Sequence, residues 1–381
     1  MQIGKIHLVW ESEQSHLFSN PSYTEEERDS FAQILKHSEK WPAHIWLATS
    51  GSIVQKWVGL SKKAFLASAQ AVNIHLKSNE KDVWVNALPY FHVGGLSIWA
   101  RAYLSGAQVC DFKEIQAAKW SAEAFFQYLV SVQGTLSALV PTQLYDLVSL
   151  GKKAPSCLRA LIIGGGALSP FLYTKAIELG WPVLPSYGLT ECASQVATAS
   201  LETINTCQGT KEMPDLQLLS HIQAREEGVF LSFFGPSLMT TYAYLRGNDV
   251  DFIDPKVKGW LTTEDRGVIS YNQVQIFGRG DALVKVGGEN VDIARLETIL
   301  EALCMQLAIS SPLAIMALPD SRLGRVVQLV VEGEKSTTLL TLVDQFNRLV
   351  LPFERLRGIR YVSKIPRSPL GKVLKHAIPI E

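Results

Sequence analysis

The segment Pro185-Ser-Tyr-Gly-Leu-Thr-Glu191 combines side chains that could bind a nucleotide. The ring of Tyr187 can stack on a base, and Gly188 lets the backbone approach a ligand closely. Thr190 and Glu191 offer a hydroxyl and a carboxylate, which suit a phosphate and Mg²⁺. The segment follows an apolar strand, so a turn that presents these side chains is predicted here. A Tyr-Gly turn alone is more often only a turn, and the functional interpretation therefore depends on other parts of the chain.

Four further segments bring glycines, hydroxyls and charged side chains close together in the same way. A glycine run, Gly164-Gly-Gly-Ala167, accompanies the first segment. Each segment alone is a weak signal, whereas five in a fixed order make coincidence implausible. The other four are Thr49-Ser-Gly-Ser52; Leu88-Pro-Tyr-Phe-His-Val-Gly-Gly-Leu-Ser97; Gly259-Trp-Leu-Thr-Thr-Glu-Asp265 with Gly278-Arg279; and Pro366-Arg-Ser-Pro-Leu-Gly-Lys372.

Strands and helices that alternate along the chain must position these segments. Alternation of this kind predicts an α/β fold of parallel βαβ units, in which ligands bind at the carboxyl ends of the strands. The glycine and hydroxyl residues fall at those ends. Apolar runs and helical spacing predict strands at 44–48, 83–88, 137–140, 158–163 and 183–185, and helices at 61–76, 122–132, 141–150 and 170–179.

The second part of the chain has a different pattern. From Gly228 it becomes β-rich, and Gly278-Arg-Gly-Asp281 is a plausible boundary. We therefore predict a large domain at 1–280 and a small α+β domain at 281–381. The expected elements are strands at 229–234, 267–271, 273–277, 313–317 and 326–331, and helices at 292–303 and 339–350.

Composition excludes several classes of protein. The 381 residues are 47% hydrophobic and carry a formal net charge of zero, so nothing favours nucleic acid or an anionic membrane as a partner. No uncharged apolar run is long enough for membrane insertion, and early glutamates argue against a signal peptide. Five scattered cysteines without metal-ligand spacing predict reduced thiols in a cytoplasmic protein. The oligomeric state is left open, with a homodimer among the alternatives.

The order and spacing of the five segments resemble the adenylate-forming acyl-CoA synthetases from Ile45 onward. Residues 88–101 and 186–198 look most like the o-succinylbenzoate–CoA ligase branch of that family, which serves menaquinone or phylloquinone biosynthesis. The resemblance implies a ligase that uses ATP and Mg²⁺ to join a small carboxylic acid to coenzyme A through an acyl-adenylate. It also implies that the small C-terminal domain is mobile.

The resemblance assigns the first reaction to a few residues. The acid attacks the α-phosphorus of ATP, so fixed cations and N–H groups should stabilise the developing charge. The family's catalytic lysine falls at Lys372, and its point charge could neutralise carboxylate and phosphate together. Glu191 would bind Mg²⁺ and Thr190 the α-phosphate. The alternatives are a solvated lysine in a basic tail and a Thr190 that caps a helix.

Nucleotide binding is implied for residues in and next to three of the segments. Asp265 would accept the ribose hydroxyls with Arg279 as a second contact, the alternative for both being an ion pair in a surface turn. Tyr187 would stack on one face of adenine, with the backbone of 165–167 on the other. The full predicted set is Thr49, Ser50, Gly51, Ser52, Lys56, Gly165, Gly166, Ala167, Ser186, Tyr187, Gly188, Asp265 and Arg279.

The acyl-substrate pocket is expected around the segment that contains His92. The resemblance has His92 line the pocket and gate CoA entry, although a lone histidine is more often a core residue. Arg101 lies on the predicted helix that follows His92 and is expected to bind the second carboxylate of a dicarboxylic acid, because an arginine fork matches a carboxylate. An exposed helix arginine is the alternative. Ser97, Gly188 and Ser194 complete this set.

The second reaction requires access for CoA. The resemblance implies that the small domain rotates about a hinge at Asp281 and exposes a tunnel, with Gly287 and Gly288 on the CoA side. One domain with two states can serve two reactions in one cleft.

The phosphate loop departs from the family pattern. Thr49-Ser-Gly-Ser-Ile-Val-Gln-Lys-Trp-Val58 lacks the usual second glycine, the proline and the in-register lysine, and Lys56 stands one place early. Glu264 replaces the usual glycine before Asp265 and adds a like charge, and most of the first N-terminal subdomain is expected to be missing. Two interpretations stay open: a ligase for o-succinylbenzoate or for another aromatic or aliphatic acid, and a nucleotide-binding relative that has lost efficient adenylation.

Overall fold

The computed structural model describes the chain except for residues 1, 4–5, 22, 49–55, 113–119, 211, 248, 281–282, 321, 369–370, 372 and 380–381. The chain divides into unit 1, residues 1–263 and 267–276, and unit 2, residues 264–266 and 277–381. The phosphate-loop residues Thr49 to Ser52, the hinge residue Asp281 and Lys372 lie outside the described residues. The predicted division at residue 280, the hinge and the catalytic role of the small domain therefore stay predictions.

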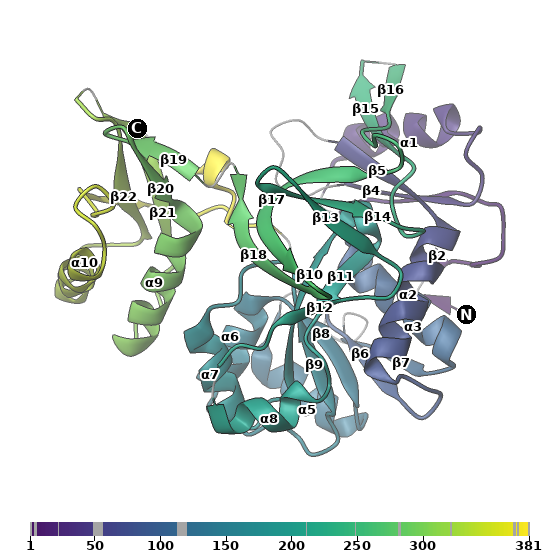
Figure 1. Cartoon of the computed structure of the whole chain (residues 1–381), viewed down its shortest axis with the longest axis horizontal. Coiled ribbons are helices and arrows are strands. Elements are labelled where there is room, and N and C mark those ends of the chain that lie inside the picture. The colour runs from purple at the N-terminus through teal and green to yellow at the C-terminus, as the bar shows by residue number, and fades with distance from the viewer. Residues whose placement is uncertain are drawn as a thin grey trace. The chain divides into compact units, whose positions relative to one another are not determined.

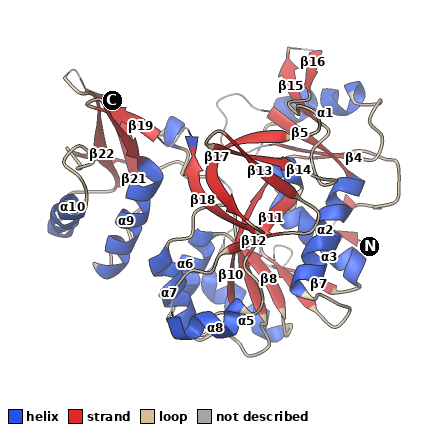
Figure 2. Ribbon diagram, viewed as in Figure 1, coloured by secondary structure: helices blue, strands red, loops and turns tan. Residues whose placement is uncertain are grey.

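A parallel sheet forms the centre of unit 1 (Figure 2). Its strands lie in the order β10-β9-β8-β6-β7 and each neighbouring pair runs parallel, as the alternating pattern predicted. Strands β8 and β9 are buried along their whole length, which fits their apolar sequences. The five strands are β6 (Val83–Asn86), β7 (Gln108–Asp111), β8 (Leu136–Leu139), β9 (Ala160–Ile163) and β10 (Val183–Leu189).

Helices cover both faces of this sheet. The chain crosses from β6 to β7 in one direction and from β8 through β9 to β10 in the other, so right-handed connections place the helices on opposite faces. Figure 1 shows α2 and α3 on one side and α5, α6 and α7 on the other. The direction reverses between β6 and β8, and open α/β sheets bind ligands at such a point. The helices are α2 (Lys62–Leu76), α3 (Val93–Ser105), α5 (Ala122–Ser131), α6 (Pro141–Ser149) and α7 (Pro170–Glu178).

Strand β10 differs from its prediction. It pairs parallel with β9 up to Pro185, then continues to Leu189 as an antiparallel partner of β11 (Ser194–Thr198), with an irregularity between Tyr187 and Gly188. The predicted turn at 185–191 is therefore wrong: strand runs to Leu189 and a short 3₁₀ helix, η1 (Thr190–Cys192), follows. The strand is longer than predicted because residues 186–189 pair with β11, which comes later in the chain. The local sequence pattern does not show this pairing.

Antiparallel strands extend the parallel sheet beyond β10. The full order is β13-β14-β17-β18-β12-β11-β10-β9-β8-β6-β7. Strand β18 contains the run predicted at 273–277, and β17 contains the run predicted at 267–271 except for Tyr271, which lies in the turn between the two strands. The added strands are β12 (Leu216–Leu218), β13 (Gln223–Glu227), β14 (Phe230–Phe234), β17 (Leu261–Ser270) and β18 (Gln273–Arg279).

A second sheet of unit 1 has the order β16-β15-β5-β4-β3. Strand β4 has the bounds that its sequence predicted. Strands β5 and β15 were not predicted from the sequence. The remaining elements of unit 1 are β1 (Gln2–Ile3), β2 (Ile6–His7), β3 (His16–Phe18), α1 (Glu25–His37), β4 (His44–Ala48), β5 (Lys56–Ser61), α8 (Thr203–Thr210), β15 (Thr241–Arg246) and β16 (Asp249–Ile253).

One apolar core joins the elements that carry the candidate site. Cys192 and Val196, from η1 and β11, belong to the same buried cluster as Leu96 and Trp99 of α3 and Val58 of β5. Side chains in such a core are closely packed, which fixes the positions of the elements that carry them. The residues around η1 therefore have a defined position relative to α3 and β5.

Unit 2 is an α+β unit with its own buried core of leucine, isoleucine and valine side chains. Gly287 and Gly288 form the turn of the β19–β20 hairpin, and their φ angles of 58° and 91° favour glycine. Among the helices of the described residues, none is both long and apolar enough to cross a membrane. The elements are β19 (Leu283–Val286), β20 (Glu289–Asp292), α9 (Ile293–Gln306), β21 (Leu313–Asp320), β22 (Gly324–Glu332), α10 (Thr337–Leu349), β23 (Ile359–Val362) and η3 (Lys375–Ala377).

Candidate active site

Helix α3 places Arg101 inside unit 1. Ser97 and Arg101 are four residues apart and so share a face of the helix. The side chain of Arg101 is 2% exposed, and its Nη2 donates to Ser97 Oγ at 3.0 Å and to Ser194 Oγ at 3.2 Å. The guanidinium carbon lies 5.6 Å from the ring centroid of Trp84. The three predicted acyl-site side chains therefore lie together, and the exposed-arginine alternative is wrong.

The charge of Arg101 is only partly satisfied. Within the described part of the chain, no carboxylate pairs with this guanidinium, and its Nε has no hydrogen-bond partner. Burial lowers the pKa of Arg101 to about 9, which still leaves the group protonated at neutral pH. A buried charge is unfavourable unless it is paired. The cluster of Ser97, Arg101 and Ser194 is thus suited to an anionic group.

The backbone at Ser194 is held in an unusual conformation. Ser194 has a φ of 99°, and Gly188 of the neighbouring strand lies against its carbonyl. A Cβ atom added at Gly188 would lie 2.2 Å from the Ser194 carbonyl oxygen. Strained backbone of this kind is often found at functional sites. Gly188 therefore allows the close approach that directs the Ser194 hydroxyl to Arg101.

Gly188→Ala is expected to destabilise the protein by about 1–3 kcal/mol, because the added methyl group forces the backbone of Ser194 to move. The free energy of urea-induced unfolding measures this effect. Gly358→Ala is the matched control, since the nearest atom to its added Cβ would be 3.7 Å away. Equal stability of the two variants would contradict the close packing of Gly188 on Ser194.

Glu191 of η1 is bound by two side chains from other strands. Its Oε1 accepts a hydrogen bond from Tyr242 Oη at 2.9 Å, and Lys56 Nζ lies 3.6 Å from the same oxygen. Burial, together with the negative charge of Glu191, raises the pKa of the Tyr242 phenol above its usual value, so this group donates. Lys56 begins strand β5 and forms an ion pair with Glu191, and its predicted contact with ATP stays a prediction.

Thr190 is the first residue of η1. The cap position of this helix is Leu189, and no side chain caps it. The alternative of a helix-capping Thr190 is therefore wrong, and Thr190 is a half-buried residue at the start of η1, next to Glu191.

His92 lies at the start of α3. It is the N-cap residue but makes no side-chain cap hydrogen bond, and its ring centroid lies 4.8 Å from that of Phe91. Its buried Nε2 has no partner among the described residues. Burial lowers the pKa of His92 to about 4, so the imidazole is neutral at pH 7. This environment is consistent with a pocket-lining residue and does not favour a charged one.

The low pKa of His92 predicts a loss of stability in acid. Burial also lowers the pKa of His221 to about 4. Above pH 6.5 both rings are neutral in the folded and unfolded states. Between pH 6.5 and 4 the unfolded chain binds protons that the folded chain does not, so stability falls as the pH falls. Thermal unfolding from pH 7 to 4 measures this slope, and His92→Gln should make it shallower. An unchanged slope in His92→Gln would contradict the assignment.

The residues predicted for adenine lie at the carboxyl ends of β9 and in β10. Gly165, Gly166 and Ala167 are exposed in the loop after β9, and Gly165 has a φ of 76°. The half-buried ring of Tyr187 lies 6.0 Å from that of Phe233. Ser186 Oγ lies within a hydrogen-bonded group of β10 and β11 side chains, 2.9 Å from Thr198 Oγ1 and 3.1 Å from Gln195 Nε2. Stacking of Tyr187 on a base stays a prediction.

The predicted ribose-binding residues belong to unit 2. Asp265 lies within strand β17 and Arg279 ends β18, so neither lies in a turn. The exposed side chain of Arg279 forms an ion pair with Glu264, which agrees with the ion-pair part of the alternative interpretation for this residue. The added negative charge that Glu264 brings next to Asp265 therefore has an opposite charge beside it. Ribose binding by Asp265 and Arg279 stays a prediction.

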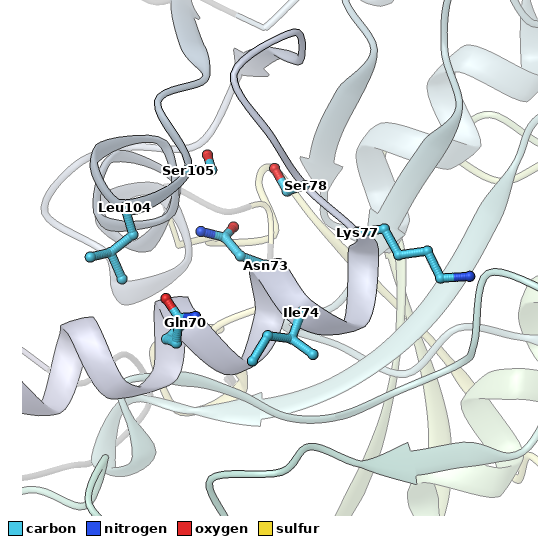
Figure 3. Close-up of a pocket in the computed structure, with 7 residues that line it drawn as sticks. All are labelled: Gln70, Asn73, Ile74, Lys77, Ser78, Leu104 and Ser105. Carbon is cyan, nitrogen blue, oxygen red and sulfur yellow. The ribbon is translucent and has the colours of Figure 1, made fainter.

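Two hollows are lined by none of Ser97, Arg101 and Ser194. One, of about 340 Å³, lies between the ends of α2 and α3 and contains none of the predicted site residues (Figure 3). There Asn73 Nδ2 donates to the carbonyl of Arg101 at 2.8 Å, while Lys77 extends away. The second, about 440 Å³ in unit 2, is lined by Gly288 of the predicted CoA side, together with Leu283, Val284, Lys285, Leu323, Gly324 and Arg325.

Comparison with known proteins identifies the family. The model of the family described as AMP-binding enzyme matches residues 16–220, which is more than half of the chain. The chain belongs to the AMP-binding enzyme family. The resemblance predicted from the five segments is confirmed at this level.

Relatives of this AMP-binding enzyme include acid–CoA ligases. The 2-succinylbenzoate–CoA ligase of Enterococcus faecalis is 28% identical over 344 residues, which cover 87% of this chain and 68% of the relative. The ligase of Staphylococcus aureus is 26% identical over 336 residues, which cover 87% of this chain and 65% of that protein. The chain thus spans about two thirds of the length of the curated relatives it matches.

A solved structure shares the fold of this AMP-binding enzyme. The o-succinylbenzoate CoA synthetase of Bacillus subtilis, in complex with its acyl-adenylate intermediate, matches with a TM-score of 0.74 at 22% identity. The match covers 95% of this chain and 77% of that one. The predicted mixed α/β fold of adenylate-forming enzymes is therefore confirmed over most of the chain.

Sequence reasoning missed Tyr242. Residues 241–246 alternate in the manner of a strand, which could have predicted β15. That pattern does not distinguish Tyr242, which contacts Glu191, from Tyr244, which has the same spacing. Only the pairing of β15 with β5 brings Tyr242 to the site.

Proposed function

We propose that this protein is an adenylate-forming acid–CoA ligase whose substrate carries two carboxylates, most specifically o-succinylbenzoate in menaquinone or phylloquinone biosynthesis. Family membership and the ligase relatives support the class of reaction. The observation that carries the choice of acid is Arg101: a guanidinium that is 2% exposed and bound by two serine hydroxyls.

The second carboxylate of the acid would bind at the cluster of Ser97, Arg101 and Ser194. A carboxylate could accept hydrogen bonds from the guanidinium and from the hydroxyls, and charge-assisted bonds of this kind are strong. Because Arg101 is already buried, binding a carboxylate pairs a charge that is otherwise poorly satisfied. A monocarboxylic acid offers no such partner.

In the first reaction, the other carboxylate attacks the α-phosphorus of ATP and the bond to pyrophosphate breaks. We propose that Lys372 neutralises the charge that builds up there and that Thr190 binds the α-phosphate. Tyr187 and the 165–167 backbone would hold the adenine, and Asp265 with Arg279 the ribose.

The residues present fit a magnesium ion bound with the nucleotide. Mg²⁺ is usually held by one or two carboxylates together with substrate phosphates and water, and Glu191 offers one carboxylate whose Oε2 accepts no hydrogen bond from the residues that the structure describes. Bound Mg²⁺ would neutralise charge on the phosphate oxygens. Glu191, held by Lys56 and Tyr242, would keep its carboxylate in place to bind the ion.

In the second reaction, the CoA sulfur attacks the acyl carbonyl, a C–S bond forms, and the C–O bond to AMP breaks. Asp281 as the hinge and Gly287 and Gly288 on the CoA side are part of this proposal. The hairpin turn at Gly287 and Gly288 leaves an exposed, side-chain-free surface that suits a narrow passage. Because ATP and CoA are intracellular metabolites and the cysteines are scattered, we propose a cytoplasmic location.

ATP–pyrophosphate exchange tests the proposed function. Exchange driven by o-succinylbenzoate, and not by benzoate or fatty acids, is the expected result. Exchange with benzoate or fatty acids alone would indicate a ligase for a different acid and would contradict the choice of o-succinylbenzoate. An absence of exchange with every acid, while ATP still binds, would favour the nucleotide-binding relative that the degenerate phosphate loop at 49–58 suggests.

A further inference from the structure

We propose that Tyr242 and Lys56 hold Glu191 by one carboxylate oxygen and leave the other for the divalent metal that accompanies ATP. In this arrangement Tyr242 is a positioning residue, and Lys56 is a cation that competes with the metal. The inference rests on the proposed function, which supplies the metal-bound nucleotide. We call Lys56, Glu191 and Tyr242 the carboxylate clasp.

Tyr242 and Lys56 of the carboxylate clasp contact the same oxygen of Glu191, Oε1. Tyr242 Oη donates to it at 2.9 Å, and Lys56 Nζ lies 3.6 Å away. The same ammonium lies 4.2 Å from the ring centroid of Tyr242, so each member contacts the other two. Among the residues that the structure describes, none donates a hydrogen bond to Oε2. One oxygen is thus engaged and the other is available.

Backbone hydrogen bonds connect the three segments that carry the carboxylate clasp. Strands β5 and β15 are antiparallel and place Tyr244 opposite Lys56, so Tyr242 is the diagonal neighbour of Lys56 on the same face. Glu191 is tied to the loop before β15, because its carbonyl accepts a hydrogen bond from Met239 N at 2.7 Å. The three side chains therefore come from elements whose relative positions are set by backbone hydrogen bonds.

The two partners of Glu191 should have opposite effects on metal binding. The hydroxyl of Tyr242 carries no charge and restricts rotation of the carboxylate, and partners of this kind commonly strengthen metal binding. The ammonium of Lys56 neutralises the same charge that a metal would neutralise. The Lys56 and Glu191 side chains are only 26% and 14% exposed, so water weakens their attraction less than at the surface.

Binding of Mn²⁺ in the presence of saturating ATP tests the carboxylate clasp in the full-length protein. Bound Mn²⁺ is measured by electron paramagnetic resonance, which does not depend on catalysis. Tyr242→Phe removes one hydroxyl and is expected to raise the half-saturating Mn²⁺ concentration roughly tenfold. Lys56→Gln is expected to lower it, by about threefold or more, because the competing charge is gone.

Tyr244→Phe is the matched control. It removes a hydroxyl from the same face of the same strand, two residues away, and no hydrogen bond joins Tyr244 to Glu191 in the described part of the chain. Its half-saturating Mn²⁺ concentration should equal that of the wild type. Thermal unfolding of all three variants separates a folding defect, which lowers the bound fraction, from a shift in metal affinity.

The outcomes are distinct. Opposite shifts for Tyr242→Phe and Lys56→Gln support the inference. An unchanged value in Tyr242→Phe, a higher value in Lys56→Gln, or no bound Mn²⁺ in the wild type overturns it. If the opposite shifts are found but no acid drives pyrophosphate exchange, the carboxylate clasp stands and the proposed ligase activity fails.

Discussion

Lys372→Ala is expected to abolish acyl-adenylate formation while largely sparing thioester formation from supplied acyl-adenylate. In the first reaction two anions meet at the α-phosphorus, so the loss of one fixed cation should lower the rate by about 10²–10³-fold. The second reaction joins a thiol to an already activated carbonyl and has less need of that charge. ATP–pyrophosphate exchange measures the first reaction, and CoA consumption with synthetic acyl-adenylate measures the second.

The control for Lys372→Ala is a lysine from the same C-terminal tail. Lys375 Nζ pairs with Glu297 at 2.7 Å, and the two side chains are 38% and 40% exposed. Exposed pairs contribute less than about 1 kcal/mol, so Lys375→Ala reports the simple loss of a charge from the tail. If Lys372→Ala reduced both reactions equally, a structural lysine would be the better interpretation.

Arg101→Met is expected to raise the KM for o-succinylbenzoate by about 10–150-fold, which corresponds to the ~1.5–3 kcal/mol of a hydrogen bond to a charged group. Methionine fills much of the same buried space without the charge. Replacing a buried charge by an apolar side chain is often neutral or stabilising, so the unfolding temperature should not fall. Steady-state kinetics and thermal unfolding on the same preparation separate binding from folding.

A second substrate completes the Arg101 experiment. Arg101→Met should leave the KM for ATP unchanged, since the lost guanidinium is proposed to bind the acid and not the nucleotide. Ser97→Ala should give a smaller rise with o-succinylbenzoate, because it removes one hydroxyl and leaves the charge. An unchanged KM for o-succinylbenzoate in Arg101→Met would remove Arg101 from the acid site.

Much of the parallel sheet could be predicted from the sequence because its signals are local. Helix α2 begins one residue after the predicted start because Ser61 caps it, its hydroxyl accepting a hydrogen bond from Ala64 N. Strands β8 and β9 are short buried runs between helices. Such elements are specified by neighbouring residues, so their order and type follow from the pattern.

The antiparallel parts could not be predicted because their partners are distant in the chain. Strand β15 pairs with β5, which joins Tyr242 to Val58. The continuation of β10 beyond Pro185 depends on β11 in the same way. The helical spacing of Ser97 and Arg101 puts them on one face, but only the packing of α3 against β11 shows that this face is buried. The sequence therefore predicted which residues belong to the candidate site, but not how their side chains contact one another.

The cluster around Arg101 also has a consequence for folding. Its guanidinium and the Ser194 hydroxyl are 93 residues apart in the chain, whereas β10 and β11 are separated by only η1 and one further residue. Contacts of long sequence separation form late, because closing a long loop is entropically unfavourable. A newly synthesised chain could therefore form the β10–β11 hairpin well before the Arg101 cluster is complete, and the acid selectivity that we propose would then require a fully folded chain.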